Sequence, residues 1–129
     1  MNLIVLTGAS RGLGLAMAGQ LIAQYDPERP DQQHLHLLCI SRGVSDALAD
    51  QAQQVRKTGC TLMQWPLDLG RSVEAGNALA RWLNEQDGEN YLSATLINNA
   101  GVIPGIAPLS ALTPEEISQA LRVDLEAPM

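Results

Sequence analysis

Short, mainly apolar segments alternate along the chain with longer segments in which apolar residues recur at helical spacing. A continuous apolar run is typical of a strand buried on both faces, because neither set of its alternating side chains meets water. The pattern therefore predicts strands inside a sheet rather than strands with one solvated face. Leu3–Leu6 is such a continuous run, and the mainly apolar segments Leu35–Ile40, Cys60–Leu67 and Leu92–Ile97 are predicted to be the other three strands.

The segments between these runs place apolar residues three or four positions apart, which gives a helix one apolar face. The faces of the first three helices comprise Leu15, Ala18, Gly19 and Ile22; Leu48, Ala52 and Val55; and Ala75, Leu79, Trp82 and Leu83. The first helix is predicted to run from Leu15 to about Tyr25. The second is predicted to be capped by Ser45, to have Arg56 and Lys57 in its last turn and to have Gly59 just beyond its end. The third is predicted to end at Asp87–Gly88.

Two further segments complete the pattern. Asp26–His34 contains two prolines and most of the local polarity, so it is predicted to be an exposed loop. Thr113-Pro114-Glu115-Glu116 has the sequence of a capping box with proline at the first helical position. A last helix is therefore expected from this point to about Leu125.

Strands that alternate with helices in this order predict an α/β fold with a parallel sheet and helices on both faces. In a doubly wound sheet the first four strands would lie in the order 3-2-1-4, and a ligand would bind beyond their carboxyl ends. We therefore expect residues 1–129 to form a single domain whose unusual residues, at the strand ends, meet at one edge of the sheet.

A glycine-rich stretch from Thr7 to Gly14 joins the first strand to the first helix. Unpaired backbone N–H groups at a helix start, together with the helix dipole, make such a stretch an anion site. Gly8 would permit the tight turn, Gly12 would let a phosphate approach the main chain, and Gly14 would allow close packing of helix on strand. The spacing is not that of the standard dinucleotide fingerprint or of a Walker loop. By itself it would also suit an ordinary glycine-rich turn.

The second strand ends at Ser41-Arg42, the place where a dinucleotide-binding fold selects its cofactor. A carboxylate there holds the ribose 2′-hydroxyl of NAD, whereas an arginine accommodates the 2′-phosphate of NADP. No carboxylate occurs from Cys39 to Val44, and Arg11 in the glycine loop could supply a second guanidinium. We therefore predict that NADP(H) is favoured over NAD(H). The alternative is that both arginines are solvated surface residues.

Two motifs together resemble the short-chain dehydrogenase/reductase family: the Thr-Gly-x-x-x-Gly-x-Gly loop of residues 7–14, and Asn98-Asn99-Ala100-Gly101 at the end of the fourth strand. The resemblance covers nearly the whole chain. It implies a Rossmann-type fold and hydride transfer between a nicotinamide dinucleotide and a small carbonyl or alcohol substrate. The implied cofactor contacts are Gly8, Ser10, Arg11, Gly12, Leu13 and Gly14 for the pyrophosphate, Ser41 and Arg42 for the 2′-phosphate, Asp68 and Leu69 for the adenine, and Asn98, Ala100 and Gly101 for the ribose beside the nicotinamide.

Two carboxylates have competing interpretations. Asp68 could instead cap the following helix, since aspartate is a good N-cap residue. Asp124 stands where the family has a catalytic asparagine in a Val-Asn-Leu stretch, and this departure puts the water relay assigned to that asparagine in doubt. Asp124 shares the apolar side of its helix with Ile117 and Leu121, where a carboxylate needs a hydrogen bond or a proton. The alternative is a solvated carboxylate at the chain end.

The family's catalytic serine and Tyr-x-x-x-Lys pair have no counterpart in this chain. Tyr25 is followed at the fourth position by Arg29, and Tyr91 by Thr95. The only lysine is Lys57. The second half of the doubly wound sheet is also absent, so the resemblance is to a member truncated after about four strands. We expect the chain to bind a dinucleotide and to be inactive alone.

A non-catalytic nucleotide-binding or interaction module is the alternative function, because the fourth strand would be an exposed apolar edge able to pair with another chain. A methyltransferase of similar topology is disfavoured, since Arg42 stands where an acid that binds ribose would be expected.

The formal net charge of −6 argues against a nucleic-acid binder that uses a general basic surface. No apolar stretch is as long as a signal peptide or a membrane span requires. Cys39 and Cys60 lie within mainly apolar segments, so we expect both to be buried free thiols in a reducing compartment. We therefore expect a cytoplasmic homo-oligomer without membrane or nucleic-acid partners. His34 and His36 lack further ligands at metal spacing, so we expect strand-edge histidines and no metal.

Overall fold

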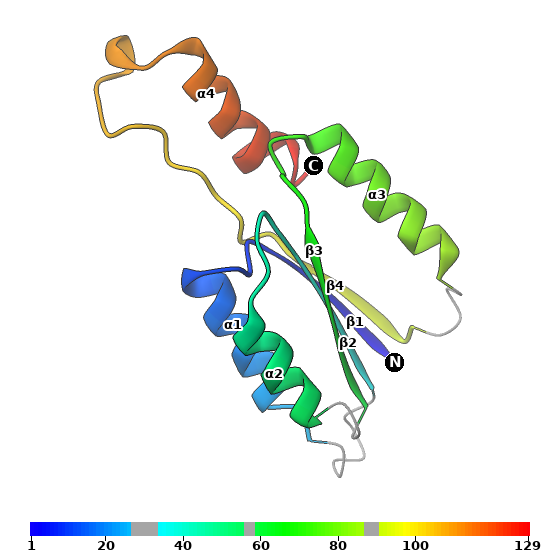
Figure 1. Ribbon diagram of the computed structural model, residues 1–129. Helices are drawn as coiled ribbons and strands as arrows, with labels where there is room; N and C mark the ends of the chain where they lie inside the picture. The colour runs from blue at the N-terminus through cyan, green and yellow to red at the C-terminus, as the bar shows by residue number, and fades with distance from the viewer. Residues whose placement is uncertain (27–33, 56–58, 87–90) are drawn as a thin grey trace.

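Four parallel strands form one sheet in the order β3-β2-β1-β4, which confirms the predicted doubly wound arrangement (Figure 1). The strands are β1 (Asn2–Thr7), β2 (Leu35–Ser41), β3 (Cys60–Pro66) and β4 (Ser93–Ile97). The computed structural model describes residues 1–26, 34–55, 59–86 and 91–129. Most of the loop predicted at 26–34 and the helix ends predicted at Arg56–Lys57 and Asp87–Gly88 lie outside these residues.

Helices cover both faces of the sheet, as the alternation of elements predicted. Helices α1 (Gly12–Ala23) and α2 (Asp46–Val55) lie on one face, and α3 (Ser72–Glu85) lies on the other (Figure 1). Leu6 and Cys39 are paired in register and belong to the core under α1 and α2, whereas the neighbouring pair Val5 and Leu38 belongs to the core under α3. Both sets are buried, which explains why β1 and β2 are mainly apolar.

Helix α1 begins at Gly12, earlier than the Leu15 that the apolar pattern predicted, and ends at Ala23 rather than Tyr25. Leu13, between Gly12 and Gly14, is 70% exposed, so the first helical turn shows no apolar face before Leu15. The pattern could not reveal that these glycines already form the first helical turn. The end of the glycine loop is consequently part of the helix N-terminus.

The predicted helix caps are present. Ser45 Oγ accepts a hydrogen bond from Leu48 N at 3.3 Å at the start of α2. Thr113 Oγ1 accepts from Glu116 N at 3.2 Å, and Glu116 Oε2 accepts from Thr113 N at 2.8 Å, which completes a capping box before α4 (Pro114–Leu121). The hydrogen bond from the Thr113 backbone holds the pKa of Glu116 below its usual value. Beyond Leu121 the chain does not continue as an α-helix but forms the π-helical segment η4 (Arg122–Glu126).

Cys39 and Cys60 are buried free thiols, as predicted, and burial raises the pKa of Cys39 to about 11. The strand-edge interpretation is wrong for His36, because β2 has a neighbour on each side and the ring of His36 lies in the layer under α3. Within the part of the chain that the structure describes, no group of three or more His, Cys, Asp and Glu residues is placed to hold a metal ion.

Strand β4 forms one edge of the sheet and pairs with β1. Leu92, just before it, is 67% exposed and Leu96 within it is 51% exposed, which agrees with the predicted exposed apolar edge. None of the described helices has both the length and the apolar character needed to cross a membrane.

Candidate functional site

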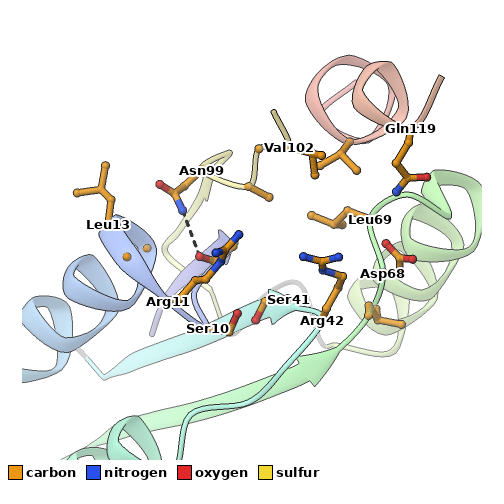
Figure 2. Close-up of a pocket in the computed structure, with 17 residues that line it drawn as sticks. Ser10, Arg11, Leu13, Ser41, Arg42, Asp68, Leu69, Asn99, Val102 and Gln119 are labelled. Carbon is orange, nitrogen blue, oxygen red and sulfur yellow. Dashed lines mark hydrogen bonds between the residues drawn. The ribbon is translucent and has the colours of Figure 1, made fainter. Parts of the chain in front are cut away.

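A cavity of about 500 Å³ lies where the loops that follow all four strands meet (Figure 2). Its lining comes from the glycine loop, from the ends of β2 and β3, from the loop after β4, and from α4 and η4. The lining residues are Gly8, Ser10, Arg11, Gly12, Leu13, Gly14, Ser41, Arg42, Leu67, Asp68, Leu69, Asn99, Ala100, Gly101, Val102, Gln119 and Val123. The structure thus brings together every predicted cofactor residue except Asn98.

The glycines of the loop are required by its close packing. Gly8 has a φ of 73°, and a Cβ there would lie 2.8 Å from the Ala100 Cα. A Cβ on Gly14 would overlap the Gly8 carbonyl oxygen and lie 2.5 Å from Asn99 Nδ2. Gly12 is different, because its φ is 58° but a Cβ there would meet nothing within 4 Å. The loop is therefore packed tightly on its protein side and open at the start of α1.

Thr7 and Asn99 hold the ends of β1 and β4 together. The Thr7 hydroxyl accepts hydrogen bonds from the N–H groups of Asn99 and Ala100, each at 3.0 Å. Asn99 Nδ2 in turn donates to the carbonyl oxygens of Thr7 at 3.1 Å and Gly8 at 3.3 Å. These contacts fix the loop after β4 against the glycine loop, and so fix one wall of the cavity.

Asn98 is exposed and is not one of the residues that line the cavity, whereas its neighbour Asn99 is, so the contact predicted between Asn98 and the ribose stays a prediction. In extended chain, successive side chains point to opposite sides, so only one of two adjacent asparagines can face the glycine loop. The Asn98-Asn99 pair correctly marked the end of β4 as part of the site, but the sequence did not indicate which of the two side chains faces the glycine loop.

Two arginines and one aspartate are the charged residues of the lining. Figure 2 shows Arg11 extending from the glycine loop and Arg42 from the end of β2, with both guanidinium groups at the cavity. Both residues are exposed. Ser41 is buried, and its hydroxyl donates to the Gly43 carbonyl oxygen at 2.9 Å, which shapes the turn that carries Arg42. The cavity therefore has a positive side, although the chain has a net charge of −6.

Asp68 does not cap helix α3, since the N-cap of α3 is Arg71. Its Oδ1 instead accepts from Gly70 N at 2.9 Å, and its carbonyl oxygen accepts from Arg71 N at 3.0 Å. The helix-cap interpretation is therefore wrong in its detail. Asp68 stabilises the turn between β3 and α3 while lining the cavity beside Leu69.

Of the two interpretations of Asp124, the one that placed it on the apolar side of the helix is wrong, and the solvated carboxylate agrees with the structure. It is exposed, and its Oδ1 accepts a hydrogen bond from Val102 N at 2.8 Å. Val123, in the π-helical segment η4, lines the cavity and is only 5% exposed. Sequence analysis also missed Leu67, Val102 and Gln119, because a loop and a helix face gave no motif to mark them.

The sequence profile of the short chain dehydrogenase family matches residues 2–129. The chain belongs to this family. A curated relative, benzil reductase ((S)-benzoin forming) of Bacillus subtilis (strain 168), is 30% identical over 129 residues, which make up 100% of this chain and 45% of that protein. The chain thus spans about half the length of this relative.

Solved structures of short-chain dehydrogenases share the same architecture. A metagenomic short-chain oxidoreductase in complex with NADP matches with a TM-score of 0.73 and 26% identity, over 98% of this chain and 51% of that one. A short-chain dehydrogenase/reductase from Burkholderia vietnamiensis matches with a TM-score of 0.68 and 28% identity, over 98% and 51% of the two chains. The cavity of this chain therefore lies in a fold that binds a nicotinamide dinucleotide in relatives.

Proposed function

We propose that the chain carries the cofactor-binding half of an oxidoreductase that moves a hydride between NADP(H) and a carbonyl or alcohol carbon. The observation that carries this proposal is the single cavity shared by the glycine loop, Arg11, Arg42 and Asp68. A relative named as a benzil reductase and a relative solved with NADP support the same class.

The glycine loop suits the pyrophosphate. The N–H groups of the first turn of α1 have no acceptor within the helix and point out of its start, where the helix dipole also favours an anion. Gly12 stands at this opening, and the space that a Cβ would take is free of atoms within 4 Å. A phosphate could therefore approach the main chain at Gly12 and Leu13 without displacing a side chain.

Arg11 and Arg42 suit a 2′-phosphate. A guanidinium binds phosphate through two parallel N–H donors, and the two arginines approach the cavity from separate loops. A carboxylate that would prefer the ribose hydroxyl of NAD is absent from the turn at 41–44. This is the reason for proposing NADP(H) rather than NAD(H).

The remaining walls suit the two ends of a dinucleotide. Asp68 and Leu69 would hold the adenine, and Ala100 and Gly101 leave room for the ribose beside the nicotinamide. When bound, NADPH would supply the hydride that reduces a carbonyl carbon. The proton for the oxygen would come from the family's Tyr-x-x-x-Lys pair, which is not in this sequence. We therefore expect cofactor binding without turnover from the 129-residue chain.

The test is a calorimetric titration of the folded chain with NADPH and NADH, repeated for Arg42→Ala. The chain should bind NADPH more tightly, and Arg42→Ala should weaken NADPH binding about tenfold, since a charge-assisted hydrogen bond is lost. NADH binding should hardly change. Arg81→Ala, which removes an exposed arginine from α3, is the matched control. Equal affinities for NADPH and NADH would overturn the proposed preference, and no binding of either would overturn the cofactor site.

A non-catalytic interaction module is the second candidate, favoured by the exposed apolar edge at β4. Two results together would favour this candidate. The first is a stable stoichiometric partner that covers Leu96, and the second is dinucleotide binding without turnover by any longer form of the chain. Carbonyl reduction with NADPH by a longer form that supplies the Tyr-x-x-x-Lys pair would reject it.

We further propose a cytoplasmic homo-oligomer, supported by the buried free cysteines and by the exposed Ile106 and Leu109 before α4. Light scattering on the purified protein tests the oligomer, and a monomer at all concentrations would reject it.

A further inference from the structure

The residues that follow β2 form a short turn that leads into α2. Arg42, Gly43 and Val44 are exposed, and Ser45, directly before α2, is half-buried. Because none of these side chains is buried, the shape of the turn depends mainly on its hydrogen bonds. Arg42 extends from this turn to the cavity, so the position of its guanidinium depends on the same hydrogen bonds (Figure 2).

Both ends of the turn are hydrogen-bonded to the neighbouring edge strand β3 or to the residue directly after it. At the first end, Leu67 N donates to the Ser41 carbonyl oxygen at 2.9 Å. At the other end, Ser45 N donates to Gln64 Oε1 at 2.8 Å, and Gln64 Nε2 donates to the Ser45 carbonyl oxygen at 2.9 Å. The amide of Gln64 therefore pairs with the backbone of Ser45 as a neighbouring strand would. Arg42 lies between these two fixed points.

The pairing with Ser45 requires a glutamine at position 64. A side-chain amide has an acceptor and a donor side by side, which matches the N–H and the carbonyl oxygen of one backbone residue. A carboxylate at this position would lack the donor, and an apolar side chain would lack both groups. Asparagine has the amide but is one methylene shorter. The second anchor of the turn thus depends on a single side chain of β3.

We propose that Gln64 is a positioning residue for cofactor selection, which holds Arg42 where its guanidinium meets the 2′-phosphate of NADP(H). This inference rests on the proposed function, and Gln64 itself does not line the cavity. An exposed arginine loses conformational entropy when a ligand immobilises it and the turn that carries it. The hydrogen bonds of Gln64 order this turn before NADPH binds, which reduces that loss. NADH has no 2′-phosphate, so its affinity depends little on where Arg42 lies.

The alternative is that Gln64 only stabilises the start of α2, since Ser45 also caps that helix through its hydroxyl. The two roles differ in the ligands that they affect. A less stable helix would lower the affinity for NADPH and NADH alike, whereas a misplaced Arg42 would lower the affinity for NADPH alone. The ratio of the NADH and NADPH dissociation constants, measured on the same protein, therefore separates the two roles.

The experiment measures calorimetric dissociation constants for NADPH and NADH in the parent chain, Gln64→Met, Arg42→Ala and the double variant. Gln64→Met keeps an unbranched side chain and removes both hydrogen bonds. It should weaken NADPH binding about fivefold, the size of one net hydrogen bond, and change NADH binding less than about twofold. In the Arg42→Ala background the same change should alter NADPH binding less than about twofold, because the group that Gln64 positions is gone.

Two control variants accompany the experiment. Gln54→Met, at an exposed glutamine of α2, should leave both dissociation constants unchanged. Ser45→Ala removes the capping hydroxyl but keeps the backbone groups that Gln64 binds, so it should lower the free energy of unfolding and leave the ratio unchanged. Circular dichroism checks the folding of each variant. Gln64→Asn, whose shorter side chain withdraws the amide from Ser45, takes the place of a Gln64→Met variant that does not fold.

A ratio of dissociation constants that stays at the parent value in Gln64→Met would overturn this inference alone. An equal effect of Gln64→Met with and without Arg42 would also overturn it, as would a ratio that falls as far in Ser45→Ala. A parent chain that binds neither dinucleotide, or binds both equally, would overturn the proposed function with it.

Discussion

The carboxylate of Asp124 accepts a hydrogen bond from the backbone N–H of Val102 at 2.8 Å. This contact joins η4, at the end of the last helix, to the loop that follows β4. A side chain added at Gly101 would stand 3.7 Å from the same carboxylate oxygen, so the loop passes close to Asp124. Asp124 therefore positions the wall of the cavity that contains Val102, although its own side chain lies outside the lining.

Replacing Asp124 should show whether this contact matters for stability. Asp124→Ala removes the acceptor and should lower the free energy of unfolding by about 1 kcal/mol, the usual size of one hydrogen bond. Asp124→Asn retains an oxygen that can accept from Val102 N and should stay close to the parent chain. Urea unfolding followed by circular dichroism measures both. Asp50→Ala, on the exposed face of α2, is the control. Equal losses in the alanine and asparagine variants would contradict this role of the hydrogen bond.

A substitution at Gly14 tests the close packing of α1 on β1 and β4. Gly14→Ala would push a methyl group into the Gly8 carbonyl oxygen and the Asn99 amide, so it should lower the free energy of unfolding by about 1–3 kcal/mol, as overpacking does. Gly76→Ala in α3 is the matched control, because nothing lies within 4 Å of its added Cβ. That change should raise the free energy of unfolding by about 0.5–1 kcal/mol, since alanine is the better helix former. Thermal melting compares the two, and equal shifts would show that helix propensity alone decides both.

The order of the strands and the place of the site could be predicted because local chemistry determines both. The apolar run Leu3–Leu6 and the mainly apolar segment Leu35–Ile40 indicate strands buried on both faces, and the helix between them indicates that the two strands are parallel. Parallel strands end at one edge, so the glycine loop, Arg42 and Asp68 had to meet there. No knowledge of side-chain packing was needed for this step.

The details that failed depend on packing that a pattern does not encode. Which of Asn98 and Asn99 faces the glycine loop depends on where β4 ends. The inward residue of the last helix is Val123 rather than Asp124, and Leu121 on the predicted apolar face is 54% exposed, so apolar spacing indicated a face other than the one that packs. Gln119 had no motif to mark it, since its position beside Asp68 comes from the path of α4 across the cavity.

His36 connects several elements on the face covered by α3. Its Nδ1 lies 2.7 Å from the Tyr91 hydroxyl and its Nε2 lies 3.0 Å from Met63 Sδ. The ring packs edge-on against Trp82, with 5.5 Å between ring centroids. Burial among these groups lowers the pKa of His36 below its ordinary 6.5, because a charged imidazole loses hydration there.

The lowered pKa of His36 predicts that the chain loses stability in mild acid. Well above pH 6.5 the ring is neutral in both the folded and the unfolded chain, so the histidine adds no pH dependence there. As the pH falls below 6.5 the unfolded chain takes up the proton first, and the free energy of unfolding decreases until the pH passes the pKa of the folded state. His36→Gln removes this titration. Urea unfolding should be measured at several pH values from about 5 to 8. The free energy of unfolding of the parent minus that of His36→Gln should become smaller as the pH is lowered. His34→Gln, at an exposed position, controls for the loss of a histidine, and a difference that stays constant with pH for His36→Gln would contradict the prediction.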